Sequence, residues 1–497
     1  MVNEERYARQ IALGWDQERI QQAAIAILGN NNVDLNLFLT FLGFDHILNV
    51  DDRTGNPLLQ GHFLDINLEQ LVGGENSPDV KTVAALMRRL QPDSQAFGVA
   101  HDLSGEYLRQ VVRMADVVVE TRQHPDARES TLAYAMKSNT PAVFISNLGN
   151  AVLVHTFTPE MPLDQREKSF FLCTHGDGFN PLLLYGASAH AAGEVVNHVL
   201  KQGKRPTTPF VWNLGGDERT WYAVDHEFAF DPAHFRDLTI LQVGVGGTGV
   251  NTAYLVSRFI QPRRLYLVEP DDVEESNQNR QVLYYSRTSI GRPKVDVALE
   301  VLGKDPRVTT ELVGLKQLFD PSFCLDDRID LIIDTTSGDV ARLLIQNFAI
   351  AHGIPLLSVG ADAYAAQVHR LVPGIHGCLD HQYGVYNNAV YEALLQNRPG
   401  CDQVPEGSNI VTTAVGGAFT VGEIPSALRP EIYGRSPRDI LYYRLTQPER
   451  AYVAEVTGPC GCGPKPLVIP DLKDVRFIET PGMPTTILVR GEVLERS

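Results

Sequence analysis

The stretch LTILQVGVGGTGVNTAYLVSRFIQPRRLYLVEPDD, residues 238–272, decides the fold. It runs from a short apolar segment through a glycine turn into an apolar-faced helical pattern, and then into a second apolar segment that ends at Glu269. A glycine turn between a strand and a helix lets backbone amides approach a phosphate at the helix N-terminus. We therefore expect a Rossmann-like strand-helix-strand unit with a nucleotide at its glycine loop.

An earlier stretch repeats this plan with a damaged loop. AIAILGNNNVDLNLFLTFLGFDHILNVDD, residues 24–52, has the same order of segments, and its Gly29 corresponds to Gly244. Further downstream, DVVVETRQHPDAR echoes DLIIDTTSGDVAR. Short apolar segments that alternate with helical patterns predict mostly parallel sheets covered on both faces. We expect an α/β protein of two tandem Rossmann-like repeats, the first degenerate and the second intact.

The length of 497 residues is sufficient for two large domains and smaller appendages. We place the degenerate domain at 1–204, a connector at 205–235, the intact domain at 236–434 and a small β-rich tail at 435–497.

The charge argues against two classes of partner. With 43 Lys and Arg against 60 Asp and Glu, the formal net charge is -17. Such a field repels phosphate backbones and anionic lipids, so we expect neither a nucleic-acid nor a membrane partner. The start MVNEERYARQ is charged and no run of 18 apolar residues occurs, which predicts a cytoplasmic protein.

The nucleotide site is expected in the second half. Its loop residues are Gly244, Gly246, Gly247 and Gly249, and Glu269 can accept hydrogen bonds from ribose hydroxyls. These features alone fit a nicotinamide-dependent oxidoreductase equally well, and a structural glycine turn is the alternative without function.

The next stretch, EPDDVEESNQNRQ, favours adenylation. Acidic, amide and guanidinium groups just beyond the second strand suit a triphosphate with its metal, whose concentrated charge must be held for in-line attack on the α-phosphorus. The candidates are Asp271, Asn277, Arg280 and Gln281, with Lys294 of GRPKVD as a further point charge. Solvated surface charges are the alternative for any one of them.

The motifs GVGGTG, SNQNRQ, GRPKVD and IIDTTSG, in this order, resemble the ubiquitin-activating family, including the bacterial adenylyltransferases of sulfur carriers. The resemblance covers about 236–434 well and the first half more loosely, beginning with RYARQI at 6–11. It implies ATP as cofactor and assigns Arg9 to the nucleotide site of the other half. A surface or capping role is the alternative for Arg9.

The magnesium site implied by the resemblance departs from the family pattern. The family usually carries an aspartate three residues after Asp334, where this chain has Ser337. Asp339 or Asp271 can compensate, because Mg²⁺ uses few protein ligands and keeps several waters. The alternative for Asp334 is a strand-end residue that only caps the following helix.

Two short cysteine and histidine pairs predict a structural zinc site. They are Cys378 with His381, and Cys460 with Cys462. Four such ligands suit tetrahedral Zn²⁺ and would tie the tail to the second domain. A buried thiol and an unrelated glycine-cysteine turn are the alternative.

The remaining cysteines receive separate interpretations. Cys401 lies in a polar loop that resembles the crossover loop of single-domain relatives, so we expect it to attack the acyl adenylate and form a thioester. A loop cysteine without function is the alternative. Cys173 is interpreted as its degenerate counterpart and Cys324 as a core thiol.

The resulting hypothesis is a ubiquitin-like modifier activating enzyme that passes its substrate to a conjugating enzyme, similar to those of antiphage operons. The first alternative is an adenylyltransferase for a sulfur carrier or peptide, without a thioester. A nicotinamide-dependent oxidoreductase and a non-catalytic scaffold are further alternatives. Whether the chain also forms a homodimer is left open.

Overall fold

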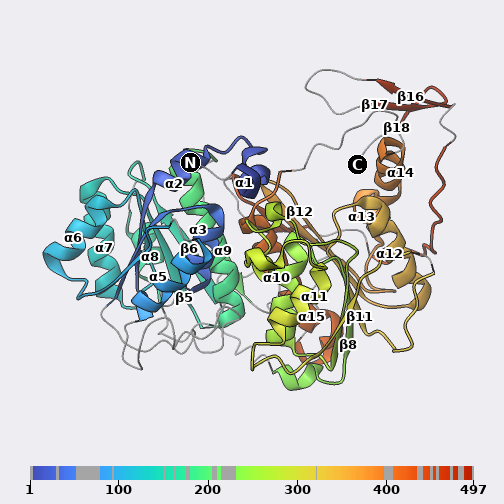
Figure 1. Ribbon diagram of the computed structural model, residues 1–497, viewed down its shortest axis with the longest axis horizontal. Helices are drawn as coiled ribbons and strands as arrows, with labels where there is room; N and C mark the ends of the chain where they lie inside the picture. The colour runs from blue at the N-terminus through green and yellow to red at the C-terminus, as the bar shows by residue number, and fades with distance from the viewer. Residues whose placement is uncertain are drawn as a thin grey trace.

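The computed structural model describes most of the chain. The described residues are 4–29, 33–51, 79–91, 94–149, 151–161, 164–174, 180–203, 210–213, 231–320, 322–396, 407–433, 440–447, 451–454, 458–470, 474–478 and 486–494. Two α/β bodies lie side by side, and a small sheet flanks the second body (Figure 1). The expectation of a mixed α/β fold with parallel sheets is confirmed.

The first body is built on a seven-stranded sheet. From edge to edge its strands are β3 (Phe97–Ala100), β2 (His46–Asp51), β1 (Ala24–Leu28), β4 (Val117–Glu120), β5 (Ala142–Asn147), β6 (Ala151–Phe157) and β7 (Phe210–Asn213). The first five strands are parallel, and β6 and β7 continue the sheet antiparallel.

The second body has an eight-stranded sheet with the same order of connections. Its strands are β10 (Glu311–Leu315), β9 (Arg264–Val268), β8 (Thr239–Val243), β11 (Leu331–Asp334), β12 (Leu356–Ala361), β13 (Ala365–Leu371), β14 (Ile440–Arg444) and β15 (Ala451–Ala454). Again five parallel strands precede the antiparallel ones. Strands β7, β14 and β15 thus extend the two sheets into the ranges 205–235 and 435–497.

Helices cover both faces of each sheet, as expected for parallel strands. The first body carries α3 (Val33–Leu42), α5 (Asp79–Leu90) and α9 (Pro181–Leu200) on its inner face, and α6 (Gly105–Met114), α7 (Pro125–Ser138) and α8 (Gln165–Leu172) on its outer face. The second body carries α10 (Gly247–Leu255), α11 (Lys294–Leu302) and α15 (Ile410–Leu428) inside, and α12 (Asp339–His352), α13 (Leu379–Tyr383) and α14 (Val385–Gln396) outside. The short helices α1 (Glu4–Ile11), α2 (Gln17–Gln22) and α16 (Pro430–Tyr433) complete the fold.

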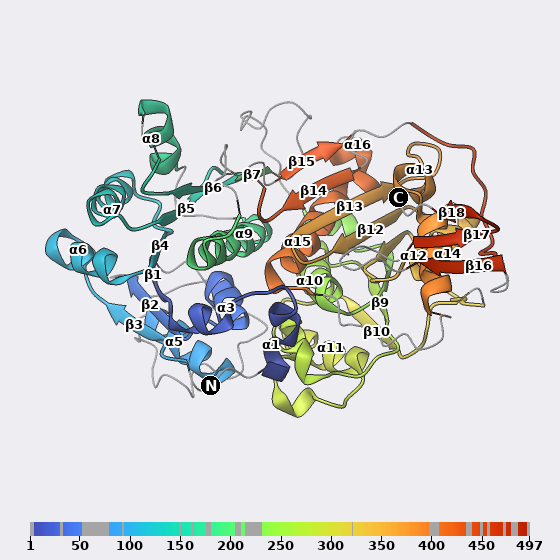
Figure 2. The same ribbon diagram turned by 90° about the horizontal axis from the view of Figure 1, so that it is seen from above.

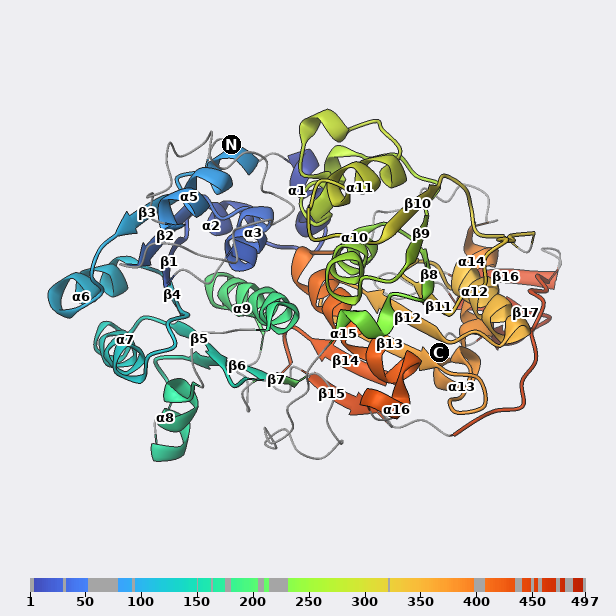
Figure 3. The same ribbon diagram turned by 90° about the horizontal axis from the view of Figure 1, so that it is seen from below.

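The two bodies share one hydrophobic core, because their inner helices pack directly on each other. Helices α9 and α15 run side by side between the sheets (Figure 2, Figure 3). Both are rich in small residues, which lets them approach closely: a Cβ on Gly186 would lie 3.4 Å from the Ala418 Cβ, and one on Gly193 would lie 2.8 Å from the Val411 Cγ1. Asn409 begins α15, accepting hydrogen bonds from Val411 and Thr412.

A third, three-stranded sheet lies beside α14 (Figure 1). Its antiparallel strands are β16 (Val475–Ile478), β17 (Thr486–Val489) and β18 (Glu492–Leu494). The fully buried Ile487 of β17 packs with Val390, Tyr391 and Leu394 of α14. This small core fixes the end of the chain to the outer face of the second body.

Candidate functional site

The glycine loop lies at the carboxyl end of β8, the central parallel strand of the second sheet. Gly244 has a φ of +92°, a conformation that favours glycine, and Gly249 packs so closely that an added Cβ would lie 2.4 Å from the Gly244 oxygen. Gly246 faces the other way, since a Cβ there would have no heavy atom within 4 Å. The loop therefore has one packed side and one side with space beside the N-terminus of α10.

Glu269 stabilises this loop. It follows β9, and its Oε2 atom accepts a hydrogen bond of 2.7 Å from the Val245 amide. Its Oε1 atom accepts a bond of 3.2 Å from the Asp271 amide. Burial raises the pKa of the Glu269 carboxyl, against the opposing effect of Lys294. The side chain that we expect at a ribose thus also fixes the turn, and ribose binding stays a prediction.

Lys294 lies between the two acidic residues that follow β9. Its Nζ atom is 3.1 Å from Asp271 Oδ2 and 3.8 Å from Glu269 Oε1, and 6% of the residue is exposed. Its amide also donates to the Asp271 carbonyl at 3.0 Å. A buried ammonium at the N-terminus of α11 is thus held beside the glycine loop.

Arg280 is a buried cation next to the same loop. It follows the short helix η3 (Glu275–Asn277), and its Nη1 atom donates to the Ser276 carbonyl at 2.5 Å and to Asn279 Oδ1 at 3.0 Å. A Cβ on Gly247 would lie 3.7 Å from its Nε atom. Burial, and secondly the positive charge of Arg9, lower the pKa of Arg280 to about 10.

Arg9 comes from the first half of the chain. Helix α1 crosses to the second body and packs against η3 (Figure 2, Figure 3). Arg9 lies close enough there for its charge to act on Arg280. Two positive charges therefore act on each other across this interface, and a bound anion would stabilise them.

Several amide side chains around Arg280 have no protein partner for one polar atom. Gln281 Oε1, Gln278 Nε2 and Asn279 Nδ2 are buried without a hydrogen bond. Asn277 is engaged instead, because its Oδ1 atom accepts from the Glu274 amide at 2.9 Å and closes the η3 turn. Of these atoms, the two amide donors Gln278 Nε2 and Asn279 Nδ2 could donate hydrogen bonds to an anionic ligand such as a nucleotide triphosphate.

The residues expected at magnesium lie after β11, on the other side of β8. Asp334 is fully buried, and its Oδ1 atom accepts from the Thr336 amide and hydroxyl at 2.9 and 2.7 Å. Its Oδ2 atom accepts from Ser358 Oγ at 2.6 Å. Asp334 thus stabilises the turn after β11, but it does not cap α12 as the alternative interpretation expected, because the N-cap residue of α12 is Gly338. Ser337 is exposed, and Asp339 begins α12. Magnesium binding here stays a prediction.

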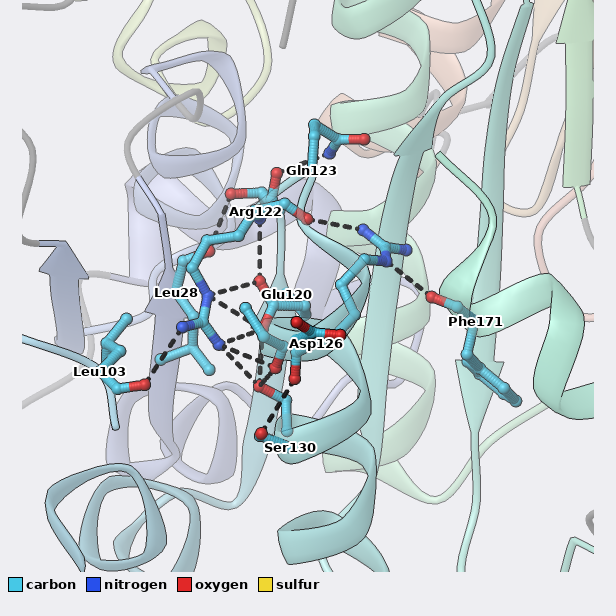
Figure 4. A network of polar contacts seen from close by, with 12 residues as sticks. Leu28, Leu103, Glu120, Arg122, Gln123, Asp126, Ser130 and Phe171 are labelled. Carbon is cyan, nitrogen blue, oxygen red and sulfur yellow. Dashed lines mark hydrogen bonds and ion pairs between the residues drawn. The ribbon is translucent and has the colours of Figure 1, made fainter. Parts of the chain in front are cut away.

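The corresponding loop of the first half has the same backbone turn, but an arginine side chain packs against it. Gly29 has a φ of +102°, and Thr121 packs against it as Thr335 packs against Gly244. Arg122 then folds over the turn, where its Cγ atom lies 3.1 Å from the position of a Gly29 Cβ. Figure 4 shows its guanidinium paired with Glu120, at 2.6 Å between Nη2 and Oε2.

Arg122 has no counterpart in the second half, where Thr336 stands at the matching position. The same motif contains an arginine that both halves share: Arg128 donates to the Arg122 and Ile145 carbonyls, and Arg342 to those of Thr336 and Val359. Lys81, which matches Lys294, is exposed. The sequence did not lead us to Arg122. The available signal was that the aligned motifs have an arginine in the first half where the second half has a threonine.

The four predicted zinc ligands lie together. The ligand atoms of Cys378, His381, Cys460 and Cys462 are all within 4.8 Å of one another. His381 Nδ1 lies 3.2 Å from Cys378 Sγ and 3.6 Å from Cys462 Sγ. Edges of this length suit a tetrahedral ion with bonds of about 2.3 Å to sulfur and about 2.0 Å to nitrogen. The residues fit Zn²⁺, which would clamp residues 458–470 to α13.

The other cysteines give mixed results. Cys401 lies outside the described residues, so its role as nucleophile stays a prediction. Cys173 is exposed at the end of α8. The prediction of a core thiol at Cys324 is wrong, because the residue is exposed. Its neighbour Phe323 turns inward and takes the core position of this loop.

No helix of the part that the structure describes has the length and apolar character needed to cross a membrane.

Residues 230–428 match the model of the ThiF family. The Aspergillus niger protein named adenylyltransferase and sulfurtransferase uba4 is 33% identical over 163 residues, which are 30% of this chain and 33% of that protein. The Thermus thermophilus sulfur carrier protein adenylyltransferase is 33% identical over 145 residues, 28% of this chain and 51% of that protein. The chain thus spans about a third to a half of the length of these relatives.

Among solved structures, the crystal structure of selenomethionine PaaA aligns with 45% of this chain and 66% of that chain, at 19% identity and a TM-score of 0.35. This similarity is too low to add to the assignment. The glycine loop and its flanking strands lie within residues 230–428, the part of this chain that is similar to the ThiF family.

Proposed function

We propose that this chain uses ATP to adenylate the C-terminal carboxylate of a ubiquitin-like protein and then captures the acyl group on Cys401. The observation that carries the proposal is that Arg280 lies beside the glycine loop, 3.7 Å from the position of a Gly247 Cβ, while helix α1 of the first half packs against η3 and brings the charge of Arg9 within range of Arg280. A hydride-transfer enzyme requires no such concentration of positive charge.

In this proposal the second repeat is the active one and the first is a degenerate support. Arg122 and Glu120 fill the turn of the first repeat, whereas the second has Thr336 there and leaves Lys294 and Arg280 beside the loop. Helix α1 supplies Arg9 across the interface. We keep the predicted ranges 1–204, 205–235, 236–434 and 435–497 as functional segments.

The chemistry consists of two displacements. A carboxylate oxygen of the substrate attacks the α-phosphorus of ATP, the bond to the bridging oxygen breaks, and pyrophosphate leaves. Arg280, Lys294 and Arg9 hold the phosphate charge. The Cys401 thiolate then attacks the acyl carbon, and AMP leaves with the bonding electrons. Mg²⁺ would supply charge neutralisation near Asp334, Ser337 and Asp339.

The proposed partner, location and metal follow from the resemblance to the ubiquitin-activating family. The thioester would pass to a conjugating enzyme, in the cytoplasm and in an antiphage context, and the fused halves supply one site whether or not the chain dimerises. Zn²⁺ at Cys378, His381, Cys460 and Cys462 would be structural. We propose neither a nucleic-acid nor a membrane partner.

A second candidate function is adenylation of a sulfur carrier without a thioester. The printed names of the Aspergillus niger and Thermus thermophilus relatives favour it. The two proposals differ at Cys401 alone, because both require the ATP site.

The test combines two measurements on the full chain with ATP and candidate carrier proteins. Exchange of labelled pyrophosphate into ATP reports the adenylate, and a gel with and without reductant reports a thioester. We expect Cys401→Ala to keep exchange and lose the reductant-sensitive adduct. Cys173→Ala and Cys324→Ala, at exposed cysteines, are matched controls that keep both.

The outcomes separate the alternatives. Exchange without any adduct in the wild-type protein favours the sulfur-carrier function. Absence of MgATP binding overturns adenylation and favours a scaffold or, if NAD binds, an oxidoreductase.

A further inference from the structure

Glu392 of α14 fills the N-terminus of a neighbouring helix, α12. Its Oε2 atom accepts a hydrogen bond of 3.0 Å from the Val340 amide, in the first turn of α12. Its Oε1 atom accepts from Gln396 Nε2 at 2.9 Å. A Cβ on Gly338, the residue that precedes α12, would lie 2.7 Å from Oε1. A carboxylate at this place satisfies unpaired amides and complements the positive end of the helix dipole.

The segment that leads into α12 is in contact with the glycine loop. Thr335 Oγ1 donates to the Gly244 carbonyl at 2.7 Å and lies 2.7 Å from the position of a Gly249 Cβ. The Thr335 amide donates to the Val243 carbonyl at 2.9 Å. Residues 335–338 therefore connect the packed side of the glycine turn directly to the helix end that Glu392 caps.

The arginine contact of this segment is common to both halves, but the described caps of the two matching helices differ. Arg342 fixes Thr336 through its carbonyl, as Arg128 fixes Arg122. Helix α7, which matches α12, begins with Pro125 after His124, and His124 makes no side-chain capping bond. The Glu392 cap thus lies in the same half as the intact glycine loop.

We propose that Glu392 is a positioning residue for nucleotide binding: by capping α12 it holds residues 335–338 in the arrangement that keeps the glycine turn ready for phosphate. This inference rests on the proposed use of ATP. Without the cap, the first turn of α12 frays and the Thr335 contact loosens, so MgATP must order the segment when it binds. Affinity falls as a result, while Arg280 and Lys294 are untouched.

The experiment measures the Kd of MgATP by calorimetry on the full chain, with no carrier protein, together with the Tm. We expect Glu392→Ala to weaken MgATP binding about tenfold, the scale of losing one helix cap. Glu392→Gln keeps an oxygen that can accept from Val340, so its Kd stays within about threefold of the wild-type value. Gln396→Ala removes the exposed bond to the same carboxylate, and we expect no change.

Each other outcome is decisive. An unchanged Kd in Glu392→Ala overturns the inference, whatever happens to the Tm, and so does an equal loss in Glu392→Gln, because the amide keeps the hydrogen bond. If the alanine variant does not fold, Gly338→Ala displaces the carboxylate instead and must weaken binding similarly. A wild-type chain that binds no MgATP overturns the proposed function as well, whereas a binding wild type with an unaffected Glu392→Ala overturns this inference alone.

Discussion

Two alanine substitutions in the glycine loop should separate stability from nucleotide binding. In Gly249→Ala the new Cβ would lie 2.4 Å from the Gly244 oxygen and 2.7 Å from Thr335 Oγ1. Both contacts are too short, and overpacking of this kind costs about 1–3 kcal/mol. In a domain of this size each kcal/mol lowers the Tm by roughly 2–4 °C, so we expect a fall of about 2–12 °C.

Gly246→Ala should behave in the opposite way. Its Cβ meets no heavy atom within 4 Å, so the Tm should stay within about 2 °C of the wild-type value. The methyl group would occupy the side of the loop where we expect phosphate. Losing one amide bond to a charged group costs about 1.5–3 kcal/mol, or roughly ten- to a hundredfold in Kd.

The assay is thermal unfolding without ligand, followed by calorimetric titration with MgATP. A Gly246→Ala protein that binds MgATP like the wild type would refute the placement of the phosphates. A Gly249→Ala protein with an unchanged Tm would refute the close packing of the turn.

Three further predictions concern other parts of the chain. Arg9→Ala should weaken MgATP binding about tenfold at unchanged Tm, whereas Arg19→Ala, exposed on α2, should leave the Kd unaltered in the same titration. Elemental analysis should find about one zinc per chain, and Cys460→Ser should lose it and make residues 458–470 sensitive to limited proteolysis; equal zinc in both proteins would contradict the site. Burial lowers the pKa of His369 to about 4, so the unfolded chain takes up a proton below about pH 6.5 that the folded chain does not. The contribution of His369 to the free energy of unfolding is therefore fully present above pH 6.5 and falls toward pH 4, by about 2 kcal/mol at pH 5. Urea titrations over this pH range should show a smaller decrease in the free energy of unfolding for His369→Asn.

The sequence predicted those parts of the site that depend on local pattern. A glycine turn between two apolar segments fixes the positions of Gly244 and Glu269, and parallel strands bring their carboxyl ends to one edge of the sheet. The zinc ligands were found in the same way, because two short pairs of soft ligands are unusual in a chain with few cysteines. The alternative role of Asp334 as a cap of the following helix was wrong, because its carboxylate bonds Thr336 and Ser358 instead.

Features that depend on tertiary contact were not predicted. Nothing around Glu392 in the sequence indicates that it reaches Val340, 52 residues away. Arg122 looks like an ordinary polar turn residue until its Cγ atom is seen to pack against Gly29. Its guanidinium pairs with Glu120 (Figure 4). Cys324 was predicted as a core thiol, but in this irregular loop Phe323 packs into the core and Cys324 is exposed.

The close packing of α9 on α15 has a consequence for how the chain can be divided. Apolar side chains of both halves pack against each other along α9 and α15, so either half made alone would expose a large hydrophobic surface to water. We expect melting as a single cooperative event, and fragments split near residue 220 to precipitate unless they are co-expressed. The gene would then tolerate loss of catalysis in one repeat far more readily than loss of that repeat itself.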